Sequence, residues 1–181
     1  MEKEKYYVFL DIDGTLWDYE YRMYNNNGLL KPQSMEALNY LLDRISDEHD
    51  VQIVMTSRRR KQFDSACKLL YDSGLKKCYK NIDKTPWVEG DRGKKILDYM
   101  KNSGQKFIYD NNILKQKLLR MLKKPIFDRY VVLEDESDKV VQAIPKDKLI
   151  SPNIISNALS MDMVKNFLTK EGILGVSHEK E

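Results

Sequence analysis

The sequence is poor in cysteine and histidine, and this scarcity excludes several kinds of chemistry. Its 181 residues include 2 cysteines and 2 histidines. Cys67 and Cys78 form neither a disulfide framework nor a metal-ligand spacing, which favours a reducing compartment. His49 and His178 give little support for a histidine base or a histidine-bound metal. Chemistry carried by carboxylates needs neither residue type and remains open.

The chain also lacks long apolar runs and a strong charge of one sign. No stretch approaches the ~20 apolar residues of a transmembrane helix, so we expect no membrane partner. Residues 1–5 are charged and the apolar run behind them is too short for a signal peptide, so we expect a cytoplasmic protein. The net charge of +3 permits a polyanionic partner but does not by itself indicate one.

Strands and helices are predicted to alternate along most of the chain. Expected strands cover residues 6–12, 51–55, 78–82, 106–109, 130–133 and 140–144, and expected helices cover residues 32–45, 60–73, 92–101, 113–122 and 153–169. Residues 17–30 are polar and rich in tyrosine, which predicts a loop or small hairpin. This pattern predicts an α/β fold, a Rossmann-like three-layer α/β/α sandwich with a mainly parallel sheet. We expect one domain over residues 1–172 and a flexible tail over 173–181.

The most informative segment is a β-type apolar run that ends in Asp11-Ile12-Asp13-Gly14-Thr15. Alternation along a strand points Asp11 and Asp13 the same way. Gly14 allows a sharp turn directly after them. Two carboxylates at the end of a buried strand are typical of a site for a hard divalent cation and for phosphate chemistry.

This segment resembles the first motif of the haloacid dehalogenase (HAD) superfamily, in which apolar residues precede Asp-x-Asp-Gly-Thr/Val. The resemblance implies a phosphohydrolase in which Asp11 is the nucleophile and Asp13 the general acid and base. It also implies Mg²⁺, held by Asp11, the backbone carbonyl of Asp13 and a further acidic residue. Asp13 distinguishes a phosphatase from the dehalogenases of the superfamily, which lack this second carboxylate and need no metal.

Phosphate-binding residues are expected after the second strand and at the start of a later helix. Thr56 follows the strand over 51–55 and matches the second motif, with Ser57 as the alternative. The third motif is a basic residue, for which we favour Lys95, with Arg92 close behind. Arg92 and Lys95 are three residues apart and share one face of a helix, so both would reach the same place.

The acidic residue of the fourth motif is ambiguous in the sequence. Asp110 follows the expected strand over 106–109, and it gives a regular alternation of elements, so we prefer it, with Asn111 assisting the metal. The alternative is Glu134 and Asp135, with Asp138 beyond them, after the strand over 130–133. This alternative resembles a branch of the superfamily whose strand ends in paired acids.

Neither gap between the expected motifs has room for a cap domain, so the resemblance implies an open site of the capless type. We expect a phosphorylated substrate, either a small molecule or a nucleic acid end. The basic run over residues 58–61 follows Thr56 and Ser57 and would suit a nucleic acid backbone, or would be a solvated helix start. A non-catalytic binding module is the alternative from another class, although such a module has no chemical need of Asp13.

Overall fold

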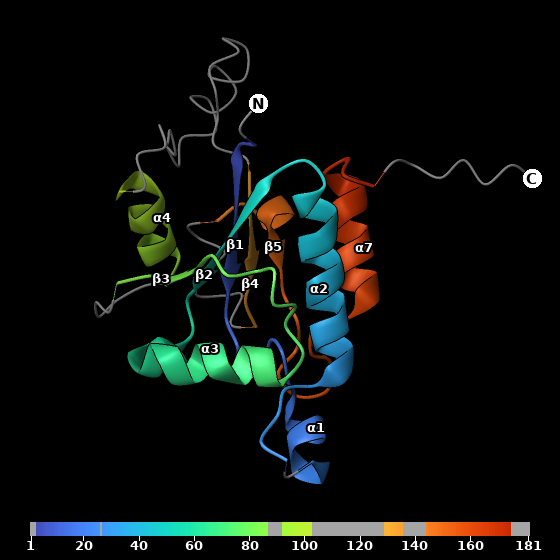
Figure 1. Ribbon diagram of the computed structural model, residues 1–181. Helices are drawn as coiled ribbons and strands as arrows, with labels where there is room; N and C mark the ends of the chain where they lie inside the picture. Colours follow the sequence, from blue (N-terminus) through green and yellow to red (C-terminus); the bar gives the residue numbers. More distant parts are fainter. Residues whose placement is uncertain (1–2, 26, 87–91, 103–128, 136–143, 175–181) are drawn as a thin grey trace, which may run out of the picture.

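The computed structural model describes residues 3–25, 27–86, 92–102, 129–135 and 144–174 (Figure 1). In these residues, five parallel strands form one sheet in the order β3-β2-β1-β4-β5. The strands are β1 (Lys5–Leu10), β2 (Asp50–Met55), β3 (Ile82–Lys84), β4 (Tyr130–Leu133) and β5 (Leu149–Ile150). The chain builds the sheet from β1 to one edge and then from β1 to the other, which confirms the predicted α/β, Rossmann-like arrangement.

Helices cover both faces of this sheet (Figure 1). The described helices are α1 (Tyr19–Tyr24), α2 (Pro32–Ser46), α3 (Phe63–Asp72), α4 (Arg92–Asn102) and α7 (Met161–Lys170), and the short 3-10 helices are η1 (Arg58–Gln62) and η2 (Lys146–Lys148). Helix α1 projects beyond the end of the sheet and covers neither face. Helices α2 and α7 pack against each other on one face, and α4 lies on the other. Among the described residues, no helix is long and apolar enough to cross a membrane.

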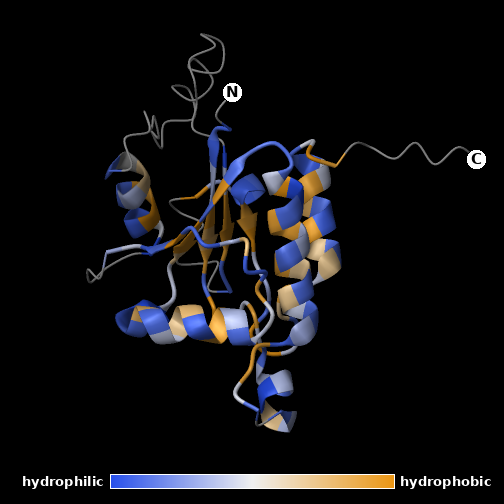
Figure 2. Cartoon of the chain, viewed as in Figure 1, coloured by the Kyte–Doolittle hydropathy of each residue, from blue (hydrophilic) through white to orange (hydrophobic). Residues whose placement is uncertain are grey.

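The two faces of β1 belong to two separate hydrophobic cores. Tyr6, Val8 and Leu10 pack into the core beneath α2 and α7, whereas Tyr7 and Phe9 pack into the core beneath α4. Figure 2 shows the matching pattern, with strands that are mostly hydrophobic and helices that are polar on one side. Because successive side chains alternate between faces, the residue after Leu10 points to the α4 side of the sheet.

Three expected elements differ from the structure. Residues 17–30 were expected to form a loop or small hairpin, but they contain α1, because the Asp18 side chain caps this helix by accepting a hydrogen bond from Tyr21 N at 2.7 Å. The last helix begins at Met161 rather than near residue 153, because the Ser160 side chain caps it by accepting a hydrogen bond from Met163 N. Strand β3 covers Ile82–Lys84 instead of residues 78–82. The predictions for residues 106–109, 113–122 and 140–143 lie outside the described part of the chain.

Candidate active site

The carboxyl ends of β1, β2 and β4 bring three polar side chains together. Leu10 pairs with Met55 of β2 and with Leu133 of β4, so the next residues, Asp11, Thr56 and Glu134, lie side by side. The backbone ladder continues to this point, with Thr56 N donating to Leu10 O at 2.8 Å and Asp11 N to Leu133 O at 2.9 Å. The position between β1 and β4 is where the order of the sheet reverses, which is the usual ligand site of such folds.

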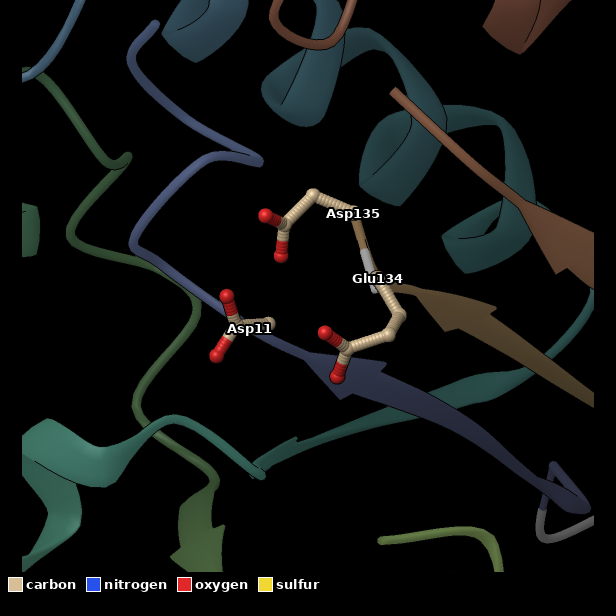
Figure 3. A group of neighbouring side chains, drawn as sticks. All are labelled: Asp11, Glu134 and Asp135. Atoms are coloured by element: carbon tan, nitrogen blue, oxygen red, sulfur yellow. The ribbon is translucent and has the colours of Figure 1, made fainter. Parts of the chain in front are cut away.

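Three carboxylates converge at this edge (Figure 3). Asp11, Glu134 and Asp135 each offer an oxygen, and these oxygens lie within 4.8 Å of one another. Asp11 is 1 % and Glu134 0 % exposed, while Asp135 is half-buried. Burial of charges at this separation is costly unless a cation compensates them.

Arg92, the first residue of α4, supplies part of that compensation. Its Nη1 forms an ion pair with Glu134 Oε1 and lies 3.4 Å from Asp11 Oδ1. Burial raises the pKa of Asp11 well above its ordinary value, the Glu134 carboxylate raises it further, and Arg92 opposes both effects. The buried Arg60 guanidinium also interacts electrostatically with Asp11 and Glu134. The three carboxylates still outnumber the two guanidinium groups, and the surplus negative charge fits a divalent cation.

Two buried oxygens at the edge also fit a ligand. Asp11 Oδ2 and Thr56 Oγ1 are buried and, within the described residues, have no hydrogen-bond partner. A buried acceptor or hydroxyl without a partner costs about 1–3 kcal/mol, so such atoms usually meet a ligand or water. Carboxylate oxygens are the ligands that Mg²⁺ prefers, and a hydroxyl suits a phosphoryl oxygen. The residues present therefore fit both the metal and the phosphate that the sequence predicts.

Gly14 allows the loop after β1 to lie directly against Asp135. Its φ is +84°, a conformation that side chains with a Cβ rarely adopt. A Cβ at this position would also overlap the Asp135 carboxylate. Glycine in the Asp-x-Asp-Gly motif is therefore required both by the backbone and by the close approach of an acidic side chain.

Asp13 lies in different surroundings from Asp11. Its Oδ1 accepts hydrogen bonds from Trp17 Nε1 at 3.1 Å and from Arg59 Nε at 2.8 Å. Arg59 Nη2 lies 2.7 Å from the same oxygen, and the Asp13 side chain is 37 % exposed. The carboxylate is thus oriented by two neighbours and remains partly open to solvent.

The structure brings together most of the residues that the sequence nominates. Asp11, Thr56 and Arg92 meet at one edge, and Glu134 and Asp135, the alternative acids, lie beside them. Lys95 lies one turn after Arg92 on α4 with a half-buried side chain. Asp110 and Asn111, the preferred acid and its assistant, lie outside the described residues. Strand β1 pairs along one edge with β2 and along the other with β4.

Arg59 contacts Asp13, although the sequence did not single it out as a candidate site residue. Only its place in the basic run, directly after Thr56 and Ser57, pointed to this edge. The run is not uniform, because Arg60 is buried and donates to the carbonyls of Thr56 and Ser57, whereas Arg58 and Lys61 are exposed. A solvated helix start therefore describes only part of the run.

A comparison with known protein families finds a match that covers most of the chain. A family model described as "HAD domain in Swiss Army Knife RNA repair proteins" matches residues 7–156. This range includes both aspartates of the first motif, Thr56, Arg92 and the Glu134–Asp135 pair. No curated protein matches the chain at a significant level.

Proposed function

The chain belongs to the family of HAD domains in Swiss Army Knife RNA repair proteins, and from this premise we propose that it is a Mg²⁺-dependent phosphohydrolase acting on phosphate monoesters. One observation carries the proposal: the buried Asp11 carboxylate has an oxygen, Oδ2, without a hydrogen-bond partner among the described residues, beside Thr56 and Arg92. A nucleophile needs a free lone pair, and a phosphoryl group needs donors around it.

In the proposed mechanism the two aspartates share the chemistry. Asp11 attacks phosphorus and forms an aspartyl-phosphate, while the bond from phosphorus to the leaving oxygen breaks. Asp13 gives that oxygen its proton. In the second step, a water molecule loses a proton to Asp13 and attacks phosphorus, which releases inorganic phosphate and restores the Asp11 carboxylate. The hydrogen bonds from Trp17 and Arg59 keep Asp13 oriented for both proton transfers.

The proposed metal ligands are the Asp11 and Asp135 carboxylates and the backbone carbonyl of Asp13, and the Glu134 carboxylate lies beside the first two. Bound Mg²⁺ would offset the negative charge of the phosphoryl oxygens next to these carboxylates. Thr56, Arg92 and Lys95 are the proposed phosphate-binding residues. The ion pair between Arg92 and Glu134 supports Glu134 as the residue that positions Arg92. Asp110 and Asn111, the ligands preferred from the sequence, lie outside the described residues and stay a prediction to be tested by mutation.

The experiment is hydrolysis of a generic aryl phosphate with and without Mg²⁺. Asp11→Asn is expected to lower turnover at least a thousandfold, because the amide is a poor nucleophile. Asp13→Asn is expected to accumulate phospho-enzyme, visible by mass spectrometry as one added phosphoryl group. Asp64→Asn, at an exposed acid of α3, is the matched control and should retain activity. Near wild-type turnover in Asp11→Asn would overturn the mechanism, and inactivity of the wild type would favour the binding module.

A nucleic acid end is the second, narrower candidate substrate. The matching family model is described by RNA repair proteins, which supports a phosphorylated RNA terminus over a small metabolite. The expected assay result is hydrolysis of a 3′- or 5′-phosphorylated oligoribonucleotide by the same aspartates. A preference for small sugar phosphates would contradict this candidate without affecting the mechanism.

A further inference from the structure

Two adjoining cavities open beside Asp13, and together they form what we call the basic groove. The first has a volume of about 330 Å³ and its lining includes Trp17, Tyr21 and Arg22. The second, of about 530 Å³, includes Arg58 and Lys61 in its lining. The cavities share Gly28, Arg59 and Leu69, so they are continuous at these residues.

The lining of the basic groove has charge of one sign. Its charged residues are Arg22, Arg58, Arg59 and Lys61, and no carboxylate occurs among the described residues that line either cavity. This contrasts with the acidic cluster on the other side of the same edge. Cationic side chains gathered in a groove raise the local concentration of polyanions and bind phosphodiesters.

The first cavity also offers flat and apolar surface. Trp17 in its lining is only 7 % exposed, and the Arg22 guanidinium lies 4.6 Å from the centroid of its ring. The accessible flat surface is therefore that of the exposed Arg22 and the half-buried Tyr21. Aromatic rings and guanidinium planes are the groups on which unpaired bases stack. Charge and stacking surface therefore occur in one groove, a combination that suits a nucleic acid strand better than an acidic peptide.

The groove adjoins the two side chains that contact Asp13, the proposed proton donor to the leaving oxygen. The leaving oxygen has to reach Asp13, and Asp13 is bounded by Trp17 and Arg59. Both residues line the first cavity. Asp13 itself lines neither cavity, but a group attached to the phosphate could reach the basic groove past these two side chains.

We propose that the basic groove binds the single-stranded RNA segment adjoining a terminal phosphate and so makes the protein prefer RNA ends over small phosphate esters. The inference rests on the proposed function, since the groove is placed relative to Asp13 as proton donor. Arg59 connects the two, because it donates to Asp13 and lines both cavities. Binding energy gained by the strand outside the reacting centre would be used to position the terminal phosphate.

The experiment compares four substrates in the presence of Mg²⁺: an aryl phosphate, a mononucleotide, a phosphopeptide and a ten-residue oligoribonucleotide phosphorylated at its 3′ or 5′ end. The wild type is expected to show a kcat/KM at least tenfold higher on one oligonucleotide than on the corresponding mononucleotide. This advantage should fall steeply with salt, because phosphate contacts release counterions. The 3′ and 5′ arms distinguish which end of the strand occupies the groove.

A matched pair of variants tests the groove itself. Arg58→Gln/Lys61→Gln removes two exposed cations of the groove and should lower kcat/KM on the oligonucleotide about three- to tenfold, with aryl phosphate hydrolysis unchanged. Lys68→Gln/Lys165→Gln removes the same net charge at exposed positions that do not line the groove, and should have no such effect.

Strand binding is also measured without catalysis, by fluorescence anisotropy of an oligoribonucleotide that carries no terminal phosphate. Binding that weakens in the groove variant but not in the control supports the inference even if hydrolysis of every substrate fails, which would count against the proposed function alone. Equal kcat/KM values on the mononucleotide and the oligonucleotide, insensitive to salt, would overturn the inference that the groove binds RNA. Hydrolysis of the aryl phosphate in the same experiment would still support the proposed mechanism. A preference for the phosphopeptide would also overturn it.

Discussion

The two sides of the Asp-x-Asp motif are built in opposite ways. On one side, Asp11 and Glu134 are buried at strand ends, where Arg92 forms ion pairs with both. The buried Arg60 also interacts with them electrostatically. On the other side, Arg58 and Lys61 are exposed on a short 3-10 helix beside open cavities. Strand ends hold charges rigidly where chemistry needs them, whereas helices and loops around them present charges to a partner. The comparison teaches that Asp13 links two oppositely charged surroundings, since it follows Asp11 by two residues and contacts Arg59 of the basic groove.

The walls of the two sides are also fixed differently. Backbone hydrogen bonds between parallel strands hold the acidic cluster in place. The wall of the basic groove that carries Tyr21 and Arg22 is instead held by one buried carboxylate, that of Asp18. Asp18 is 0 % exposed and accepts hydrogen bonds from Tyr21 N at 2.7 Å, Lys31 Nζ at 2.6 Å and Ala158 N at 3.1 Å. Burial alone would raise the pKa of Asp18, but these bonds outweigh burial and lower it.

The largest expected effect tests which acid belongs to the acidic side. Asp135→Ala should raise the Mg²⁺ concentration required for half-maximal aryl phosphate hydrolysis at least tenfold, because a ligand of the metal is lost. Asp110→Ala is the matched comparison and should have a smaller effect. A larger effect of Asp110→Ala would restore the ligand preferred from the sequence and break the assignment of metal binding to the acidic cluster.

The next effect concerns the wall of the basic groove. Asp18→Ala should lower the free energy of unfolding by about 3 kcal/mol, because a buried acceptor of three hydrogen bonds is removed. Since the folded-state pKa of Asp18 is lowered, its contribution is complete above about pH 4 and is lost as pH falls through the lowered pKa. The difference between wild type and variant, measured by urea denaturation, should therefore shrink below pH 4.

Glu36→Gln, at an exposed acid of α2, is the control for Asp18→Ala and should leave stability within about 0.5 kcal/mol of the wild type. If Asp18→Ala is as stable as this control, the capped helix α1 does not hold the wall. If Asp18→Ala loses the preference for oligonucleotides but still hydrolyses the aryl phosphate, the wall of the basic groove affects substrate preference and not the reaction itself.

The smallest effect tests how far the buried, mutually repelling carboxylates of the acidic cluster destabilise the fold. Asp11→Asn should raise the free energy of unfolding without Mg²⁺ at pH 7 by about 1–2 kcal/mol, because a buried carboxylate next to two others is neutralised. This corresponds to a rise in Tm of about 2–8 °C for a chain of this size. Excess Mg²⁺ should stabilise the wild type more than the variant.

The sign of the pH dependence follows from the raised pKa of Asp11. Between its ordinary and its raised pKa the folded state binds more protons than the unfolded state, so the stability of the wild type falls as pH rises through this window. Asp11→Asn should flatten that part of the profile, as measured by thermal unfolding from about pH 4 upward. Identical profiles would show that the carboxylates of the acidic side do not repel one another.

Local patterns were enough to name Asp11, Thr56 and Arg92 as candidates, and the structure brings these residues to one edge of the sheet. Alternation in the run before Asp11, the threonine after the second strand and the basic start of α4 all depend on residues close in sequence. The parallel register then places Asp11, Thr56 and Glu134 at one edge. Family membership also followed from the Asp-x-Asp-Gly-Thr motif, and the matching family model confirms it.

The sequence by itself determined an α/β fold with a carboxylate pair at the end of its first strand, since strand and helix periodicities are local properties of the chain. It did not determine which later strand lies beside β1, because strand pairing is decided between segments more than a hundred residues apart. The tertiary structure gave that place to β4 and so brought Glu134 and Asp135 to Asp11. It likewise brought Arg59 to Asp13, a contact between side chains 46 residues apart that no periodicity encodes.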